Sequence, residues 1–145
     1  MRLQDWLKNA WVTEHQSSAQ EIKGLLALVE RDLRDCRASE LSADWRFNIA
    51  YNAALQAAAA ALAAAGYRAA RDAHHYRVIQ SLSLTIGAAS GTVRQLDAFR
   101  KKRNLTSYEV GGRISDQEAK EMAALAEKLR AEVQRWIKTY HAALL

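Results

Sequence analysis

The chain has 145 residues, carries a net charge of +5 with a pI near 9.6, and contains one cysteine. This length is that of one domain, spanning 1–145, which buries enough surface to fold without a metal or a disulfide. The lone Cys36 excludes an intramolecular disulfide and a cysteine-based zinc site, and together with the lack of an apolar leader segment it indicates a cytoplasmic protein.

Helix-forming residues fill the sequence and proline is absent, so we predict an all-α fold. A short amphipathic stretch at about 2–11 precedes five main helices, at about 18–36, 44–65, 72–86, 90–103 and from 115 to about 140. No segment alternates between apolar and polar residues with the period of a β-strand, so we expect no strand. Short connections favour antiparallel neighbours, which predicts an up-and-down bundle.

Capping residues set the expected helix ends. Ser18 and Ser115 each stand three residues before a glutamate and so open capping boxes, while Ser42 caps the second main helix. Gly66 and Gly87 should end the second and third main helices, because glycine readily adopts the left-handed backbone of a helix C-terminus.

An alanine-rich tract, "ALQAAAAALAAAG", ends the second main helix. It is shorter than the roughly 20 residues of a membrane span, so we expect no membrane association. Small side chains let helix backbones approach closely, which places this helix at the centre of the bundle.

A basic segment, "FRKKRNLTSY", follows the apolar positions of the fourth main helix. We expect this helix to end after Arg103, with Arg100 pointing the same way from three residues earlier. Basic residues also suit the negative end of a helix dipole, but the polar residues that follow add hydrogen-bonding groups suited to phosphate and ribose. This corner is therefore a predicted anion or nucleic-acid site. Its expected nucleic-acid contacts are Arg100, Lys101, Lys102, Asn104 and Ser107.

This segment resembles the motif of the HEPN domain superfamily, in which an arginine, an adjacent polar residue and, a few residues further on, a histidine stand together. Arg103 matches the arginine and Asn104 the polar residue, but Tyr108 occupies the place of the nearest permitted histidine, and Glu109 and Val110 follow. The resemblance implies an all-α homodimer. It also implies kinship with RNA-cutting toxins that pair with nucleotidyltransferase-type antitoxins, and it makes Arg103 and Tyr108 the catalytic candidates.

The missing histidine has a chemical consequence. Metal-independent RNA cleavage needs a group that accepts and donates protons near neutral pH, and histidine, with an ordinary pKa of about 6.5, suits this role. Tyrosine, with a pKa near 10, is a poor base. His74 and His75 are adjacent on the third main helix, which is poor geometry for joint metal binding, but either can supply this function if the fold brings it to Arg103.

Asn48, Tyr51 and Asn52 recur at helical spacing on the second main helix and form a predicted supporting polar network, either a buried network between helices or part of the site. We expect the chain to bind RNA or a nucleotide in a groove shared by two copies, without a metal or cofactor. The alternatives are an active metal-independent endoribonuclease and a helical protein that binds an acidic partner.

Overall fold

The computed structural model describes residues 1–108 and 114–145, and for 105–108 it describes the backbone alone. It confirms the all-α class: helices make up most of the described chain, with one small sheet. In chain order the elements are α1 (Leu3–Lys8), β1 (Val12–Glu14), α2 (Ala19–Asp35), α3 (Ala43–Ala64), β2 (Tyr67–Ala69), α4 (His74–Gln80), a 3₁₀ turn (Ser81–Ser83), α5 (Ser90–Tyr108), α6 (Asp116–Tyr140) and a second 3₁₀ turn (Ala142–Leu144).

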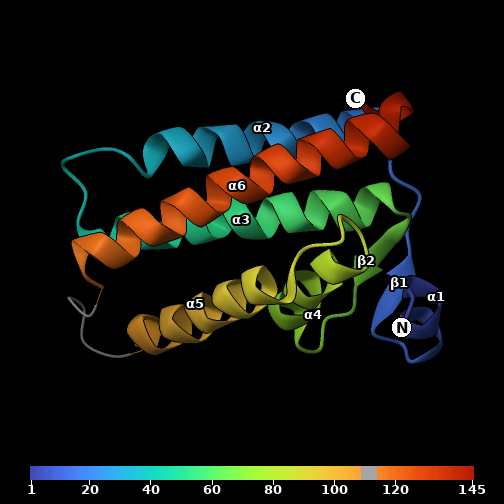
Figure 1. Cartoon of the computed structure of the whole chain (residues 1–145), viewed down its shortest axis with the longest axis horizontal. Coiled ribbons are helices and arrows are strands. Elements are labelled where there is room, and N and C mark those ends of the chain that lie inside the picture. Colours follow the sequence, from blue (N-terminus) through green and yellow to red (C-terminus); the bar gives the residue numbers. More distant parts are fainter. Residues whose placement is uncertain (109–113) are drawn as a thin grey trace.

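The helix α3 lies at the centre of the bundle, as its alanine content predicts. Figure 1 shows α2 and α6 along one side of α3 and the α4–α5 pair along the other. The alanines of its second half are almost all buried, and Tyr51 and Phe47 fill the core in its first half. Because a methyl group takes little room, neighbouring helices pack against the α3 backbone on both sides.

The predicted N-caps are present. The hydroxyl of Ser42 accepts a hydrogen bond from the Trp45 amide at 3.2 Å, and Ser115 forms the full capping box with Glu118. Ser18 caps α2, but the carboxylate of Glu21 contacts His15 Nε2 at 2.8 Å. The capping box predicted at Ser18 is therefore only half formed.

Two helix boundaries differ from the prediction. The helix α5 continues to Tyr108 rather than ending after Arg103, since no glycine or proline interrupts the intervening residues. The helix α4 ends at Gln80, where a 3₁₀ turn begins. There the Ser81 hydroxyl donates to the Val78 carbonyl at 2.6 Å, a local bond that competes with a regular helix.

The expectation of no strand was wrong. The strands β1 and β2 pair antiparallel, with Thr13 opposite Arg68. Each strand has three residues, too few for an alternating pattern to stand out in the sequence. Gly66, with φ +97°, makes the turn from α3 into β2, and its carbonyl accepts a hydrogen bond from the His15 amide at 2.9 Å.

The N-terminal segment of α1 and β1 lies at one end of the bundle, below the C-terminus in the view of Figure 1. Trp6 of α1 is buried and meets Trp11 edge to face, with ring centroids 5.8 Å apart. Within the described residues, no helix is both long and apolar enough to span a membrane.

Candidate anion-binding site

The helix α5 sets the direction of the two arginines. Leu96 and Phe99 are buried, and the Phe99 ring meets Phe47 of α3 edge to face with centroids 5.5 Å apart. These apolar contacts fix the rotation of α5 about its axis. Arg100 and Arg103 thereby lie beside α4 and α3 instead of projecting from the far face of the helix.

Arg103 lies over a tyrosine that is paired with a histidine. Its guanidinium carbon is 5.2 Å from the centroid of the Tyr51 ring, a cation–π distance. Tyr51 belongs to α3 and is buried, and its hydroxyl shares a hydrogen bond of 3.2 Å with Nδ1 of His75 on α4. The fold thus joins α3, α4 and α5 at one point, which we call the Arg103 cluster: Arg100, Arg103, Tyr51 and His75.

Arg100 is held by an acidic residue of its own helix. Its Nε donates to Asp97 Oδ1 at 2.7 Å, and only 19% of its side chain is exposed. Its guanidinium carbon lies 5.5 Å from the ring centroid of Tyr76, the residue after His75. Arg100 is therefore turned toward α4, whereas Arg103, one turn of α5 later, lies over Tyr51 of α3.

The electrostatics of the cluster keep the histidine neutral. Burial lowers the pKa of His75 below its ordinary value, and the positive charge of Arg103, then His74 and Arg100, lowers it further. Burial raises the pKa of Tyr51 to about 12, which outweighs the opposite effect of Arg103. At neutral pH the cluster thus combines two guanidinium charges with an uncharged imidazole and an uncharged phenol.

The two predicted lysine contacts lie outside this cluster. Lys101 Nζ is 3.7 Å from Asp97 Oδ2 on the exposed side of α5, and Lys102 forms an ion pair with Glu118 at the start of α6. Exposed pairs of this kind contribute about 0–1 kcal/mol to stability. Neither lysine is aimed at the Tyr51–His75 pair.

The remaining predicted contacts stand in the last turns of α5. Asn104 is exposed and follows Arg103 directly in the helix. The backbone of Ser107 and Tyr108 continues α5, but their side chains lie outside the described residues, as do Glu109 and Val110 entirely.

The predicted supporting network divides into separate parts. Tyr51 joins the Arg103 cluster, whereas Asn52 Nδ2 donates to Asp32 Oδ2 of α2 at 2.9 Å, beside a bond of 3.0 Å from Gln56. The Oδ1 atom of Asn48 is buried and has no hydrogen-bond partner among the described residues. Successive residues of a helix point about 100° apart, which is why Tyr51 and Asn52 reach different neighbours.

Three consecutive residues of α4, His74, His75 and Tyr76, lie in or near the cluster. The sequence offered both histidines as groups for proton transfer beside Arg103. The structure places His75 in the cluster, whereas His74 is exposed and contacts the Ala70 carbonyl through Nδ1 at 3.2 Å. Tyr76 was not singled out by sequence reasoning. Its only signal was its place next to the histidine pair.

Comparisons with known proteins gave no match: no family model, curated protein or solved structure is significantly similar to this chain. The resemblance to the HEPN superfamily therefore stays a prediction based on the motif.

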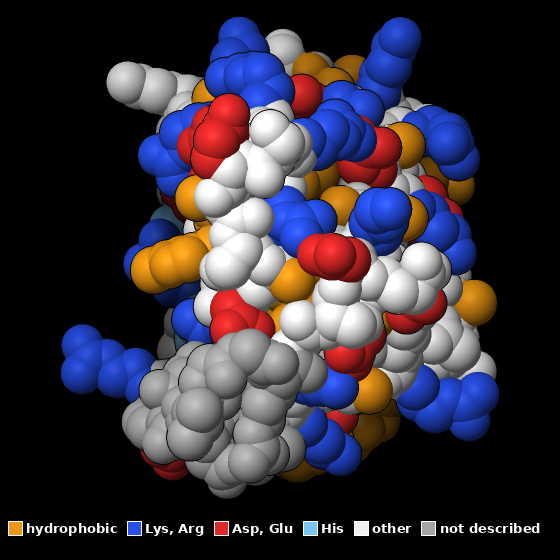
Figure 2. Space-filling model, turned by 90° about the vertical axis from the view of Figure 1, so that its left-hand side faces the viewer, with side chains coloured by type: hydrophobic (Ala, Val, Ile, Leu, Met, Phe, Trp, Pro, Cys, Tyr) orange, Lys and Arg blue, Asp and Glu red, His pale blue; other side chains and the backbone are white. Residues whose placement is uncertain are grey.

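The surface charge does not by itself mark a site. Figure 2, which views the end of the bundle where α5 terminates, shows Lys and Arg side chains spread widely with Asp and Glu between them. The Arg103 cluster is distinguished by its aromatic and histidine neighbours and not by charge density. In the part of the chain that the structure describes, no group of three His, Cys, Asp or Glu side chains is arranged to hold a metal.

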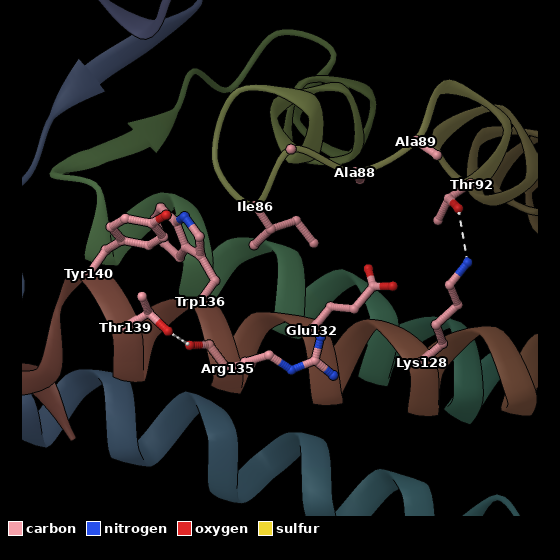
Figure 3. Close-up of a pocket in the computed structure, with 11 residues that line it drawn as sticks. Ile86, Ala88, Ala89, Thr92, Lys128, Glu132, Arg135, Trp136, Thr139 and Tyr140 are labelled. Carbon is pink, nitrogen blue, oxygen red and sulfur yellow. Dashed lines mark hydrogen bonds between the residues drawn. The ribbon is translucent and has the colours of Figure 1, made fainter.

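The cavities elsewhere on the described part of the molecule include two that are lined by α6. One, of about 390 Å³, lies between α6 and residues 86–92, with Trp136 and Tyr140 at one end and Lys128 bonded to Thr92 at the other (Figure 3). Glu132 projects into the space between them (Figure 3). The other, of about 570 Å³, lies among α2, α3 and α6, and ion pairs join its walls. Both acidic and basic side chains line each of these two cavities.

Proposed function

We propose that this chain binds RNA or a nucleotide through a phosphate group held at the Arg103 cluster. One observation carries the proposal: two guanidinium groups from successive turns of α5 converge beside the Tyr51–His75 pair. Planar guanidinium groups match the geometry of phosphate oxygens and keep their charge at all physiological pH values.

The neighbours of the arginines support an anionic ligand. His75 and Tyr51 are uncharged at neutral pH, so they add hydrogen-bonding groups without cancelling the positive charge. Asp97 is the acid in contact with Arg100, and Lys101 also lies against it. The charged groups of the cluster are therefore its two guanidinium groups, of which that of Arg100 is held by Asp97.

Binding should depend on Arg103 and on salt. Fluorescence polarisation with a labelled single-stranded RNA should show binding at low salt that weakens at high salt, because phosphate contacts release counterions. We expect Arg103→Ala to weaken binding by about tenfold or more, equivalent to about 1.4 kcal/mol.

Arg94→Ala is the matched control. Arg94 lies on the same helix, is exposed, and stands more than two turns from Arg103, so its loss should change affinity less than about twofold. Equal losses in the two variants would reduce the site to general surface charge. A complete lack of RNA binding at low salt would contradict the proposal and favour an acidic protein partner.

RNA cleavage is a second candidate, and the position of His75 favours it. Its imidazole is neutral and lies beside Arg103, although it comes from α4 and not from the motif. In the tautomer in which Nδ1–H donates to the Tyr51 hydroxyl, Nε2 has a lone pair that accepts the proton of a ribose 2′-hydroxyl. The 2′ oxygen then bonds to the adjacent phosphorus, the bond to the 5′ oxygen breaks, and that oxygen takes a proton from solvent.

The products of this reaction are a 2′,3′-cyclic phosphate and a 5′-hydroxyl end. Wild-type protein, Arg103→Ala and His75→Gln should be compared on the same RNA in the presence of a chelator. Cleavage that both variants lose would support catalysis. If wild-type protein degrades RNA no faster than Arg103→Ala, the cluster binds without cutting.

The HEPN resemblance extends the proposal to a cytoplasmic homodimer in which two such clusters border one groove, with a nucleotidyltransferase-type antitoxin as a further partner. Sedimentation equilibrium of the purified chain tests the dimer directly. A monomer at all concentrations would remove the shared groove but leave phosphate binding by each copy.

A further inference from the structure

A second set of arginine and aromatic contacts continues from the Arg103 cluster toward the N-terminal segment. The guanidinium carbon of Arg77 lies 3.9 Å from the ring centroid of Trp11 and 5.4 Å from that of Tyr76. The guanidinium carbon of Arg100 lies 5.5 Å from the same Tyr76 centroid. We call these four residues the Arg–aromatic row: Trp11, Arg77, Tyr76 and Arg100.

The short helix α4 explains how the row is built. Successive helical residues point about 100° apart, so three neighbouring side chains reach three different elements. His75 contacts Tyr51 of α3, Tyr76 meets Arg100 of α5, and Arg77 meets Trp11 beside β1. The row therefore begins at the Arg103 cluster and leads away from it across α4.

The members of the row differ in exposure. Trp11 is half-buried and backed by the buried Trp6, and Arg77 and Arg100 are also half-buried. Tyr76 is exposed at 36%, one of few large aromatic side chains so exposed among the described residues. More than a third of Tyr76 is therefore open to solvent, and two guanidinium groups lie within cation–π distance of its ring.

We propose that Tyr76 is a stacking platform for a base of single-stranded RNA, with Arg77 and Arg100 placed for the flanking phosphates. This inference rests on the proposed function and assigns it a substrate class. Bases of a duplex stack on one another and do not offer their faces, whereas single-stranded RNA stacks its bases on aromatic side chains and Arg planes. The alternation of ring and guanidinium in the row matches the alternation of base and phosphate.

The same contacts have a purely structural explanation, in which cation–π pairs hold the N-terminal segment against α4. The two explanations differ at Tyr76. A structural role predicts that removing its ring changes thermal stability and leaves RNA affinity unchanged. A stacking role predicts a loss of affinity that the phenylalanine variant restores.

The test uses fluorescence polarisation with a labelled 12-nucleotide oligo(A), either as a single strand or annealed to oligo(U) as a duplex. The single strand should bind more tightly than the duplex. Tyr76→Ala should weaken single-strand binding by about fivefold or more, because base–aromatic stacking contributes about 1–3 kcal/mol per base. Tyr76→Phe should bind like wild type, and so should Tyr140→Ala, which removes an exposed tyrosine on α6.

Other outcomes distinguish failure of the stacking platform at Tyr76 from failure of phosphate binding at the Arg103 cluster. Unchanged affinity in Tyr76→Ala, with affinity lost in Arg103→Ala, would overturn the stacking platform and leave phosphate binding intact. Duplex binding as tight as single-strand binding would overturn the substrate class. If wild-type protein binds neither probe, the proposed function itself fails. Should Tyr76→Ala not fold, Tyr76→Leu keeps apolar bulk without a ring and is expected to show the same loss.

Discussion

The two halves of α3 illustrate two uses of one helix. In residues 43–52 the polar side chains reach separate neighbours: Tyr51 reaches α4 and α5, and Asn52 reaches α2. In residues 53–64 alanine dominates and nearly every alanine is buried. The first half positions chemical groups, whereas the second half lets neighbouring helices approach the backbone.

This difference has a practical consequence. Substitutions in the alanine half should act on the stability of the whole bundle, since close-packed interiors have no room for extra atoms. Substitutions among the polar residues should act on single contacts and, at Tyr51, on the candidate site. The three predictions below test this division, in order of decreasing effect.

The largest effect is expected from Ala57→Leu. Ala57 is fully buried, so the larger side chain forces α3 and its neighbours apart. Overpacking of this kind costs about 1–3 kcal/mol of unfolding free energy, and more where backbones cannot move. Urea denaturation measures it. Ala59→Leu, on a partly exposed face two residues along, should change stability by about 0.5 kcal/mol or less. Similar losses in both variants would show that close packing around Ala57 is not the cause.

A smaller loss is expected from Asp32→Ala. Asp32 is buried, and its carboxylate accepts hydrogen bonds from Asn52, Gln56 and Arg31. Removing it leaves the side-chain amides of Asn52 and Gln56 to water, at a cost of about 0.5–1.5 kcal/mol. The control is Asp35→Ala on the exposed side of the same helix, which should be nearly neutral in the same urea titration. Equal stability of the two variants would show that this network contributes nothing.

The smallest effect is a pH dependence from His75. Its pKa is lowered in the folded chain by burial and by the charges of Arg103, His74 and Arg100. Below about pH 6.5 the unfolded chain therefore binds a proton here that the folded chain does not, so the free energy of unfolding falls as pH falls through this window. Above that window the contribution is constant.

Urea denaturation at pH 7.5 and 5.5 measures this effect. Wild-type protein should lose more stability between the two values than His75→Gln, which has no group titrating at this position. A larger loss in the variant would contradict the lowered pKa. Phosphate binding should act in the opposite direction and raise the pKa of His75, because an adjacent anion favours the imidazolium.

Local chemistry made part of the fold predictable. The caps at Ser42 and Ser115 and the end of α3 before Gly66 depend on hydrogen bonds and backbone freedom within a few residues, so the sequence alone indicated them. The three-residue strands and the extension of α5 to Tyr108 were missed. Three residues are too few to show the alternation of a strand, and the polar residues after Arg103 carry no glycine or proline that would mark the end of α5.

The sequence by itself determined an all-α bundle, a central alanine-rich helix, and two arginines one turn apart near the end of a helix, because periodicity and composition govern helices locally. Only the tertiary structure decided that Arg103 lies over Tyr51, which is bonded to His75, and that Arg77 and Arg100 both lie near the Tyr76 ring. These contacts join helices far apart in the chain. Their partners depend on how α4 and α5 pack against α3, and no local pattern encodes that packing.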